Sequence, residues 1–232
     1  MNNNMVSKTY RQGLNPLWLV VPASTIVFAL GWSNVAGMTG ALIGGIGGLV
    51  WALVLAYLVR LLDRTERWKD RLATAVLVAA AATLFTMMGG GLYEGMLMSK
   101  ALETEPEWIT TITSGPLADQ VILYFIILNS LMEVILVPLA LFLNWPFPKR
   151  RAYVFVAGLI FYALRIWTYL YFAPQYFAFG DMAFSQALVD ELKTRMAIDN
   201  IRGVLQVGEA VLFVLAALVP VTTAAASAGN DR

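Results

Sequence analysis

The chain has 232 residues, of which 59% are hydrophobic and only 13% are charged, and its formal net charge is +1. A soluble domain usually has about 25% charged residues, so this composition predicts a membrane protein. A net charge near zero also gives no field that would favour nucleic acid as a partner. The chain has no cysteine and no histidine, which excludes disulfides, haem and iron–sulfur clusters held by these residues, and most zinc sites. We therefore expect no cofactor and no metal.

Six apolar runs are long enough to cross a bilayer, which takes about 20 residues in a helix. They predict an all-α fold, a polytopic transmembrane helical bundle that forms a single integral membrane domain over residues 1–232. The expected spans are 17–36, 39–62, 72–95, 120–144, 152–173 and 203–221. So few residues separate the first two spans that we expect them to form a helical hairpin.

Glycines mark the second and third expected spans. Gly40, Gly44 and Gly48 recur every four residues and share one helical face, and small residues let two membrane helices approach closely. This face either packs within the chain or forms an interface with a second copy, in a homo-oligomer, or with another protein of a membrane complex. In the third span, Gly89–Gly91 predict a break or a kink.

A long segment, residues 178–202, precedes the last expected span. Met182, Leu188, Leu192 and Met196 recur in it at roughly helical spacing. This pattern predicts an amphipathic external helix, which either lies on the membrane surface or caps the bundle. The helix is also placed to continue directly into the last span.

Basic residues are distributed unequally between the two sides of the membrane. One side has eleven, the other has four, and Arg165 lies within a span. The richer side contains Lys8, Arg11, Arg60, Arg64, Arg67, Lys69, Arg71, Lys149, Arg150, Arg151 and Arg232. The positive-inside rule then predicts that both termini lie in the cytoplasm. We expect a multi-pass protein of the cell membrane, an inner membrane, with the lipid bilayer as its partner.

Ionisable residues inside the expected spans are the strongest indication of a site. Glu133 lies near the middle of the fourth span and Arg165 lies within the fifth. An ionised side chain at the bilayer centre costs about 2.5–3.5 kcal/mol on insertion scales, so such groups pair, line a hydrated cavity or take part in chemistry. At 1.5 Å per residue, both residues lie in the outer half of the membrane, together with Glu209 and Glu94. One arginine cannot neutralise three carboxylates, so the others must be protonated, hydrated or bound to a cation.

Other polar residues lie on the same helical faces, three or four positions away. Asn129 accompanies Glu133, Thr168 accompanies Arg165, and Gln206 accompanies Glu209. The aromatic residues around Arg165, Tyr169 among them, either belong to the boundary belt or form the wall of a pocket. We therefore predict Glu133, Arg165 and Glu209 as catalytic residues, and Glu94, Asn129, Thr168, Tyr169 and Gln206 as ligand-binding residues. A purely structural ion-pair network is the alternative.

The C-terminal segment contains Arg195, then Asp199-Asn200-Ile201-Arg202, then an apolar run. An arginine, a short spacer, Asn-x-Arg and a final spanning helix resemble the end of the anthrone-oxygenase-like family of small membrane proteins. The resemblance covers about the last 70 residues, and the family's usual four helices are fewer than the spans expected here. It implies cofactor-free oxygenation of a polycyclic aromatic compound, with Asn200 and Arg202 as the matching ligand-binding positions. Their alternative role is to cap the last span and to anchor it at the outer boundary.

Three functions are compatible with these features. The first is an integral membrane protein, an enzyme or a binding protein, that binds or transforms a small hydrophobic molecule at the buried Glu/Arg site. The second is a small transporter or channel coupled to protons or cations, favoured by the excess of carboxylates over arginine. The third is an accessory subunit of a larger membrane complex, which needs no site. We prefer the first, and the sequence does not decide whether the protein is an enzyme.

Overall fold

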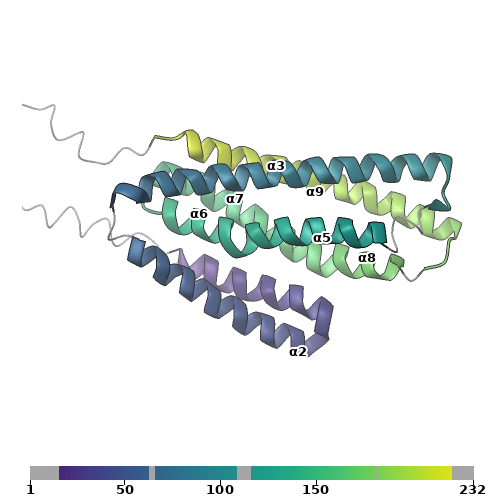
Figure 1. Ribbon diagram of the computed structural model, residues 1–232, viewed down its shortest axis with the longest axis horizontal. Helices are drawn as coiled ribbons and strands as arrows, with labels where there is room; N and C mark the ends of the chain where they lie inside the picture. The colour runs from purple at the N-terminus through teal and green to yellow at the C-terminus, as the bar shows by residue number, and fades with distance from the viewer. Residues whose placement is uncertain (1–15, 63–65, 109–115, 181, 221–232) are drawn as a thin grey trace, which may run out of the picture.

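The computed structural model describes residues 16–62, 66–108, 116–180 and 182–220, and within these ranges the chain is a bundle of helices with no strand (Figure 1). Five helices in these ranges are long and apolar enough to cross a membrane. The prediction of an all-α helical bundle is therefore confirmed. The expected number of six spans differs from five because the first helix contains two of them.

This first helix, α2 (Leu17–Leu62), is a hairpin of two antiparallel arms. Ala36 (φ −134°, ψ 22°) and Gly37 (φ 58°, ψ −141°) depart from helical geometry between the arms. A positive φ is strained for a residue with a Cβ atom, so glycine at position 37 lets the chain reverse direction there. The two expected spans 17–36 and 39–62 are thus the first and second arms of one hairpin.

Gly40, Gly44 and Gly48 of the second arm face the first arm. A Cβ atom on Gly44 would overlap the backbone carbonyl of Phe28, and one on Gly48 would overlap that of Ser24; Gly40 is equally close to the first arm. Only glycine permits so close an approach of two helix backbones. The face is therefore packed within the chain, and a partner protein could contact it only by displacing the first arm.

The third expected span lies in α3 (Glu66–Thr104), which continues without interruption through Gly89–Gly91. The predicted break at these glycines is wrong. Gly90 instead makes room for the ring of Tyr124, whose hydroxyl donates a hydrogen bond to the carbonyl of Thr86 at 2.6 Å. The glycine here provides space for a neighbouring helix rather than a bend.

Each of the next two spans is a helix interrupted by a wider, π-helical turn. The fourth span consists of α5 (Pro116–Ser130), the π turn η2 (Leu131–Leu136) and α6 (Val137–Asn144). The fifth consists of α7 (Pro148–Trp167), the π turn η3 (Thr168–Phe172) and α8 (Ala173–Gly180). Both π turns contain residues of the predicted site.

The last helix, α9 (Gln186–Leu218), joins most of the expected amphipathic segment and the last expected span in one continuous helix. Met182, the first residue of the predicted apolar pattern, precedes this helix and is exposed. Leu188 and Leu192 pack with Met98, Leu102 and Phe179 in a small hydrophobic cluster of their own. The amphipathic part thus packs on the ends of α3 and α8, as in the capping interpretation. The expected end of the span, Val221, lies outside the described residues.

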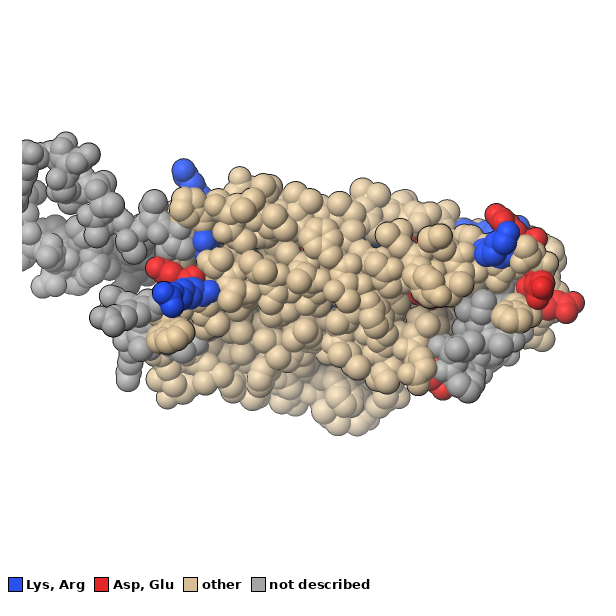
Figure 2. Space-filling model, turned by 45° about the horizontal axis from the view of Figure 1, so that its top comes forward, with Lys and Arg blue, Asp and Glu red and all other residues tan. Residues whose placement is uncertain are grey.

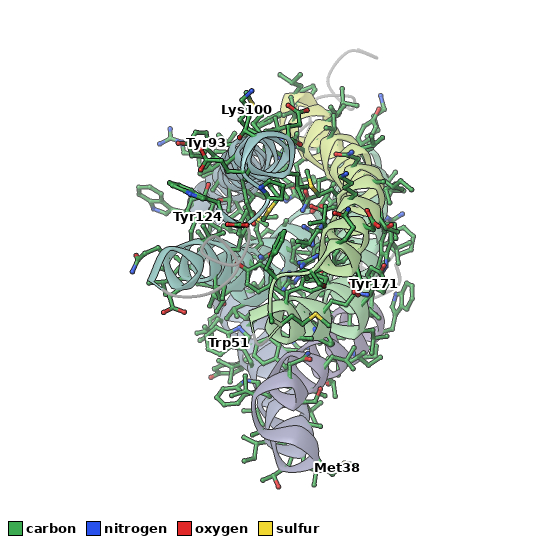
Figure 3. All side chains as sticks on the ribbon, turned by 90° about the vertical axis from the view of Figure 1, so that its right-hand side faces the viewer. Met38, Trp51, Tyr93, Lys100, Tyr124 and Tyr171 are labelled. Carbon is green, nitrogen blue, oxygen red and sulfur yellow. The ribbon has the colours of Figure 1, made fainter. Side chains whose placement is uncertain are left out.

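The helices differ in how much of their surface is covered. Helix α9 packs along α3 and α7, whereas α2 lies at the edge of the bundle, with Met38 at its tip and Trp51 at its junction with the other helices (Figure 3). In Figure 2 most of the charged side chains that can be seen lie at the two ends of the molecule, and the face between them shows almost no charged side chain. This distribution, with the five apolar helices, indicates a membrane protein.

Candidate functional site

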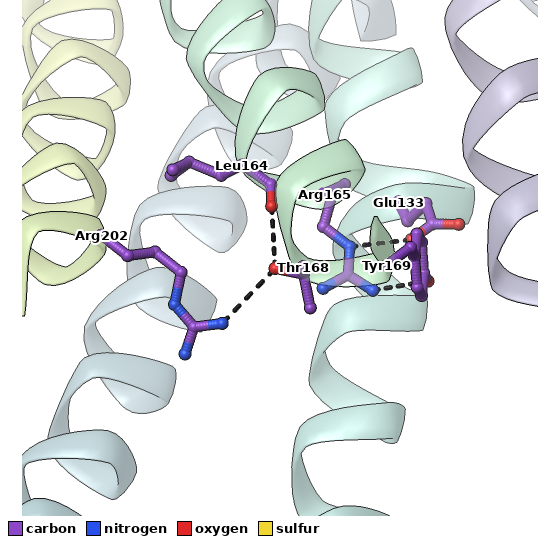
Figure 4. Close-up of polar contacts among 6 residues, drawn as sticks. All are labelled: Glu133, Leu164, Arg165, Thr168, Tyr169 and Arg202. Atoms are coloured by element: carbon purple, nitrogen blue, oxygen red, sulfur yellow. Dashed lines mark hydrogen bonds and ion pairs between the residues drawn. The ribbon is translucent and has the colours of Figure 1, made fainter. Parts of the chain in front are cut away.

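Three predicted residues meet in the middle of the bundle and form what we call the buried cluster: Glu133 of η2, Arg165 of α7 and Tyr169 of η3 (Figure 4). Arg165 Nε lies 3.0 Å from Glu133 Oε2 in an ion pair that is also a hydrogen bond. The Tyr169 hydroxyl accepts a hydrogen bond from Arg165 Nη2 and donates one to Glu133 Oε2 at 2.9 Å. Glu133 and Arg165 are 6% and 7% exposed, so their charges compensate each other inside the protein.

The π turn at Glu133 has a cause in the sequence. In an α-helix the carbonyl of Val134 would accept a hydrogen bond from the N–H of residue 138, but Pro138 has none. The Val134 carbonyl instead accepts a hydrogen bond from Trp51 Nε1, on the second arm of α2, at 2.7 Å. A side chain of the hairpin thus satisfies a backbone group that the turn leaves free.

The π turn at Tyr169 is arranged in the same way. The N–H of Ala173 donates to the carbonyl of Thr168, five residues back, so it does not reach the carbonyl of Tyr169. That carbonyl accepts a hydrogen bond at 3.1 Å from Asn34 Nδ2, on the first arm of α2. Pro174 follows directly and removes another N–H donor. Both arms of the hairpin therefore support π turns, which occur frequently at functional sites.

Glu209 of α9 is a second buried carboxylate beside the cluster. It is only 1% exposed, and its Oε1 atom has no hydrogen-bond partner among the described residues. Arg165 is near enough for its charge to act on Glu209, but no hydrogen bond joins the two in the described part of the chain. Two buried carboxylates thus share one arginine, and one of them retains an unpaired acceptor.

A second group of charged residues lies beside the buried cluster. It is on the side of the cluster that faces the end of the bundle predicted to lie outside the cell. Arg202 Nη1 donates to Thr168 Oγ1 at 3.4 Å (Figure 4). Its guanidinium also lies over the ring of Phe172, 4.5 Å from the ring centre. Arg202 Nε also lies 2.7 Å from Asp199 Oδ1. Glu94 of α3 interacts electrostatically with Asp199 and Arg202. Arg202 therefore contacts η3 inside the bundle, in addition to its place near the start of the last expected span.

Arg195 belongs to this group, although sequence reasoning did not select it. Its guanidinium lies 5.9, 5.1 and 5.2 Å from the ring centres of Phe172, Tyr176 and Phe179. These rings recur at three- or four-residue spacing along η3 and α8. This spacing could have pointed to Arg195 in the sequence. It places the aromatic rings on one side of a helix, where an arginine can stack on them.

The remaining predicted residues are not part of the cluster. Asn129 and Gln206 are half-buried, and neither is joined to the cluster by a hydrogen bond in the described ranges. Asn200 is exposed and lines a separate open cavity of about 410 Å³ between α3 and α9. Among the residues that the structure describes, no group of three or more acidic side chains could hold a metal ion.

The comparisons with known proteins give no relative. No family model, no curated protein and no solved structure matches this chain. The resemblance of the C-terminal segment to the anthrone-oxygenase-like family therefore stays a prediction. What the chain shows by itself is a membrane protein with a buried Glu/Arg pair.

Proposed function

We propose that this membrane protein binds or transforms a small hydrophobic molecule with a hydroxyl group, at the site formed by the buried cluster and Glu209. The proposal rests on the Oε1 atom of Glu209, for which the described residues provide no hydrogen-bond partner. A buried acceptor without a partner costs about 1–3 kcal/mol. A ligand hydroxyl that donates a hydrogen bond to Glu209 would remove this cost.

The surroundings of Glu209 favour an apolar ligand body. Ala210 and Phe213 of the same helix are completely buried, so this part of α9 packs in an apolar region of the bundle. Arg165 lies over the ring of Tyr169 at 4.4 Å from its centre, and such cation–aromatic pairs also accommodate flat aromatic molecules. Ligand sites in proteins usually combine a mostly apolar wall with a few polar groups that fix the orientation of the ligand.

The chemistry of the site follows from these positions. The carboxylate of Glu209 can accept the proton of a ligand hydroxyl, and the positive charge of Arg165 can stabilise the negative oxygen that remains. Glu133 and Tyr169 hold the guanidinium in place through their hydrogen bonds. Binding and proton transfer therefore need only these four side chains.

The proposal is tested with 2-naphthol, a flat aromatic probe with one hydroxyl, and with naphthalene, which lacks it. Binding to the protein in lipid nanodiscs is measured by probe fluorescence and corrected with empty nanodiscs. We expect the wild type to bind 2-naphthol about tenfold more tightly than naphthalene. Glu209→Leu should abolish this difference, whereas Glu209→Gln, which retains an acceptor oxygen, should preserve part of it.

The matched control is Glu191→Gln, an exposed carboxylate on the same helix. It should bind both probes like the wild type. Equal binding of 2-naphthol by the wild type and by Glu209→Leu would contradict the proposal.

Proton- or cation-coupled transport is the second candidate, because two buried carboxylates share one arginine. Intramembrane carboxylates of this kind form proton relays in transporters. In proteoliposomes with a pH gradient, a transporter would equilibrate the gradient faster than empty liposomes, and Glu209→Gln would abolish the excess rate. A wild-type rate equal to that of empty liposomes would exclude proton coupling.

A further inference from the structure

A second polar site lies at the end of the bundle where α3 and α7 begin. It is an open cavity of about 540 Å³, lined by Asp70, Arg71, Thr74, Ala75 and Arg150. None of these residues belongs to the buried cluster or contacts Glu209. The cavity therefore does not depend on the function proposed above.

Arg150 forms the floor of this cavity and is fixed by several helices. It is only 2% exposed. Its Nε atom donates to the carbonyl of Val219 at 2.8 Å, and its Nη1 atom donates to Thr74 Oγ1 at 3.0 Å and to Asn144 Oδ1 at 3.4 Å. These contacts use two of its three nitrogens, and Nη2 makes no hydrogen bond to any described residue. A guanidinium that is held rigidly and still has a free edge is well suited to bind an oxyanion.

The other charges give the cavity two poles. Arg71 is exposed at its mouth and supplies a second guanidinium. Asp70 is half-buried, and its charge acts on Arg150. Arginine pairs bind phosphate through several hydrogen bonds, whereas a carboxylate repels phosphate but attracts an ammonium group. Two arginines beside one aspartate therefore match a group in which a phosphate and an ammonium are neighbours.

We propose that this cavity binds a phosphoethanolamine group, with the phosphate between Arg71 and Arg150 and the ammonium at Asp70. The position of the cavity relative to the membrane spans favours a lipid as the source of the phosphoethanolamine group. One apolar span begins at Asp70, which lines the cavity, and another begins at Pro148, two residues before Arg150. The ends of membrane spans lie near the lipid headgroups. Basic pockets between membrane helices are known to bind phospholipid headgroups. A soluble phosphoethanolamine would use the same contacts.

The test measures which lipids remain bound when the full-length protein is released from nanodiscs into a mass spectrometer. The nanodiscs contain equal amounts of phosphatidylethanolamine, phosphatidylglycerol and phosphatidylcholine. We expect the wild type to retain phosphatidylethanolamine about tenfold more than either of the others, because only this lipid has both a phosphate and a hydrogen-bonding ammonium. Competition with O-phosphoethanolamine and with inorganic phosphate in solution distinguishes a lipid from a soluble source.

The variants separate the two poles without disturbing the fold. Arg150 is left intact because it binds the end of α9. Arg71→Gln should lower the retention of phosphatidylethanolamine about tenfold, and Asp70→Asn should abolish its preference over phosphatidylglycerol. Lys100→Gln, at the other end of α3, is the control and should behave like the wild type.

Displacement of the lipid by O-phosphoethanolamine, but not by inorganic phosphate, would support the proposed chemistry with a soluble source. Equal retention of the three lipids, or wild-type retention by Arg71→Gln, would overturn the proposal.

Discussion

Arg165 shows how a single charged residue is accommodated among apolar helices. Its guanidinium donates hydrogen bonds to Glu133 and Tyr169, and the side chain is buried inside the bundle. A buried ion pair adds little net stability, because removing both charges from water costs about as much as their attraction returns. Removing only one partner is costly, because the other charge stays buried without compensation. This asymmetry gives a prediction at the residue scale.

Glu133→Gln and Arg165→Met should each lower the free energy of unfolding by about 3–5 kcal/mol. The double variant Glu133→Leu/Arg165→Met should lose much less, since no uncompensated charge remains. Unfolding by denaturant in detergent micelles measures all three. Single variants as stable as the wild type would contradict the geometry of the pair. The double variant also tests the accessory-subunit hypothesis: a protein without a site should keep its function after both charges are removed.

At the scale of elements, the α2 hairpin and the two π turns depend on one another. The turns expose backbone carbonyls, and Trp51 and Asn34, one on each arm of α2, donate hydrogen bonds to them. An unpaired carbonyl in an apolar environment is costly. We therefore expect that a change in the distance between the two arms would disturb the turns that contain Glu133 and Tyr169.

Gly44→Ala tests this dependence. The new Cβ atom would overlap the backbone of Phe28, so the arms must separate, and we expect a loss of about 1–3 kcal/mol in the free energy of unfolding. Gly47→Ala is the matched control, since a Cβ atom there meets nothing within 4 Å and alanine favours the helix. Thermal unfolding in detergent compares the two. Equal stability of both variants would show that the arms are not in backbone contact.

At the scale of the whole molecule, many basic residues lie at the same end of the bundle as the two ends of the described chain. The described chain begins and ends at the same end of the bundle (Figure 1), and Arg60, Arg71, Lys149, Arg150 and Arg151 lie at the helix ends there. An excess of basic residues marks the cytoplasmic side of a membrane protein. We therefore expect this end to face the cytoplasm.

The absence of native cysteine makes the orientation directly measurable. Lys100→Cys and Lys149→Cys place single thiols at exposed positions at opposite ends of the bundle. In intact cells, a membrane-impermeant maleimide should label Lys100→Cys, whereas Lys149→Cys should react only after permeabilisation. The reverse pattern would invert the proposed orientation.

Much of this protein was predictable because the bilayer imposes simple rules. Long apolar runs must become helices, since backbone groups in lipid need internal hydrogen bonds, and the short link at Ala36–Gly40 predicted the hairpin. Glu133 and Arg165 could be expected to pair, because each would be costly alone in the membrane. These conclusions need only hydropathy, charge and spacing, which are properties of single segments.

The tertiary structure decided which segments meet. It placed Tyr169 beside Glu133 and Arg165, and it separated Asn200 from the site. It also left one oxygen of Glu209 without a hydrogen-bond partner in the part of the chain that the structure describes. Pro138 and Pro174 signalled missing backbone donors, but only the packed hairpin shows that Trp51 and Asn34 satisfy the carbonyls nearby. The predicted break at Gly89–Gly91 failed for the same reason: a glycine permits either a bend or a close neighbour, and the packing of Tyr124 against Gly90 selects the neighbour. Such outcomes depend on contacts between residues far apart in the chain, which local pattern does not encode.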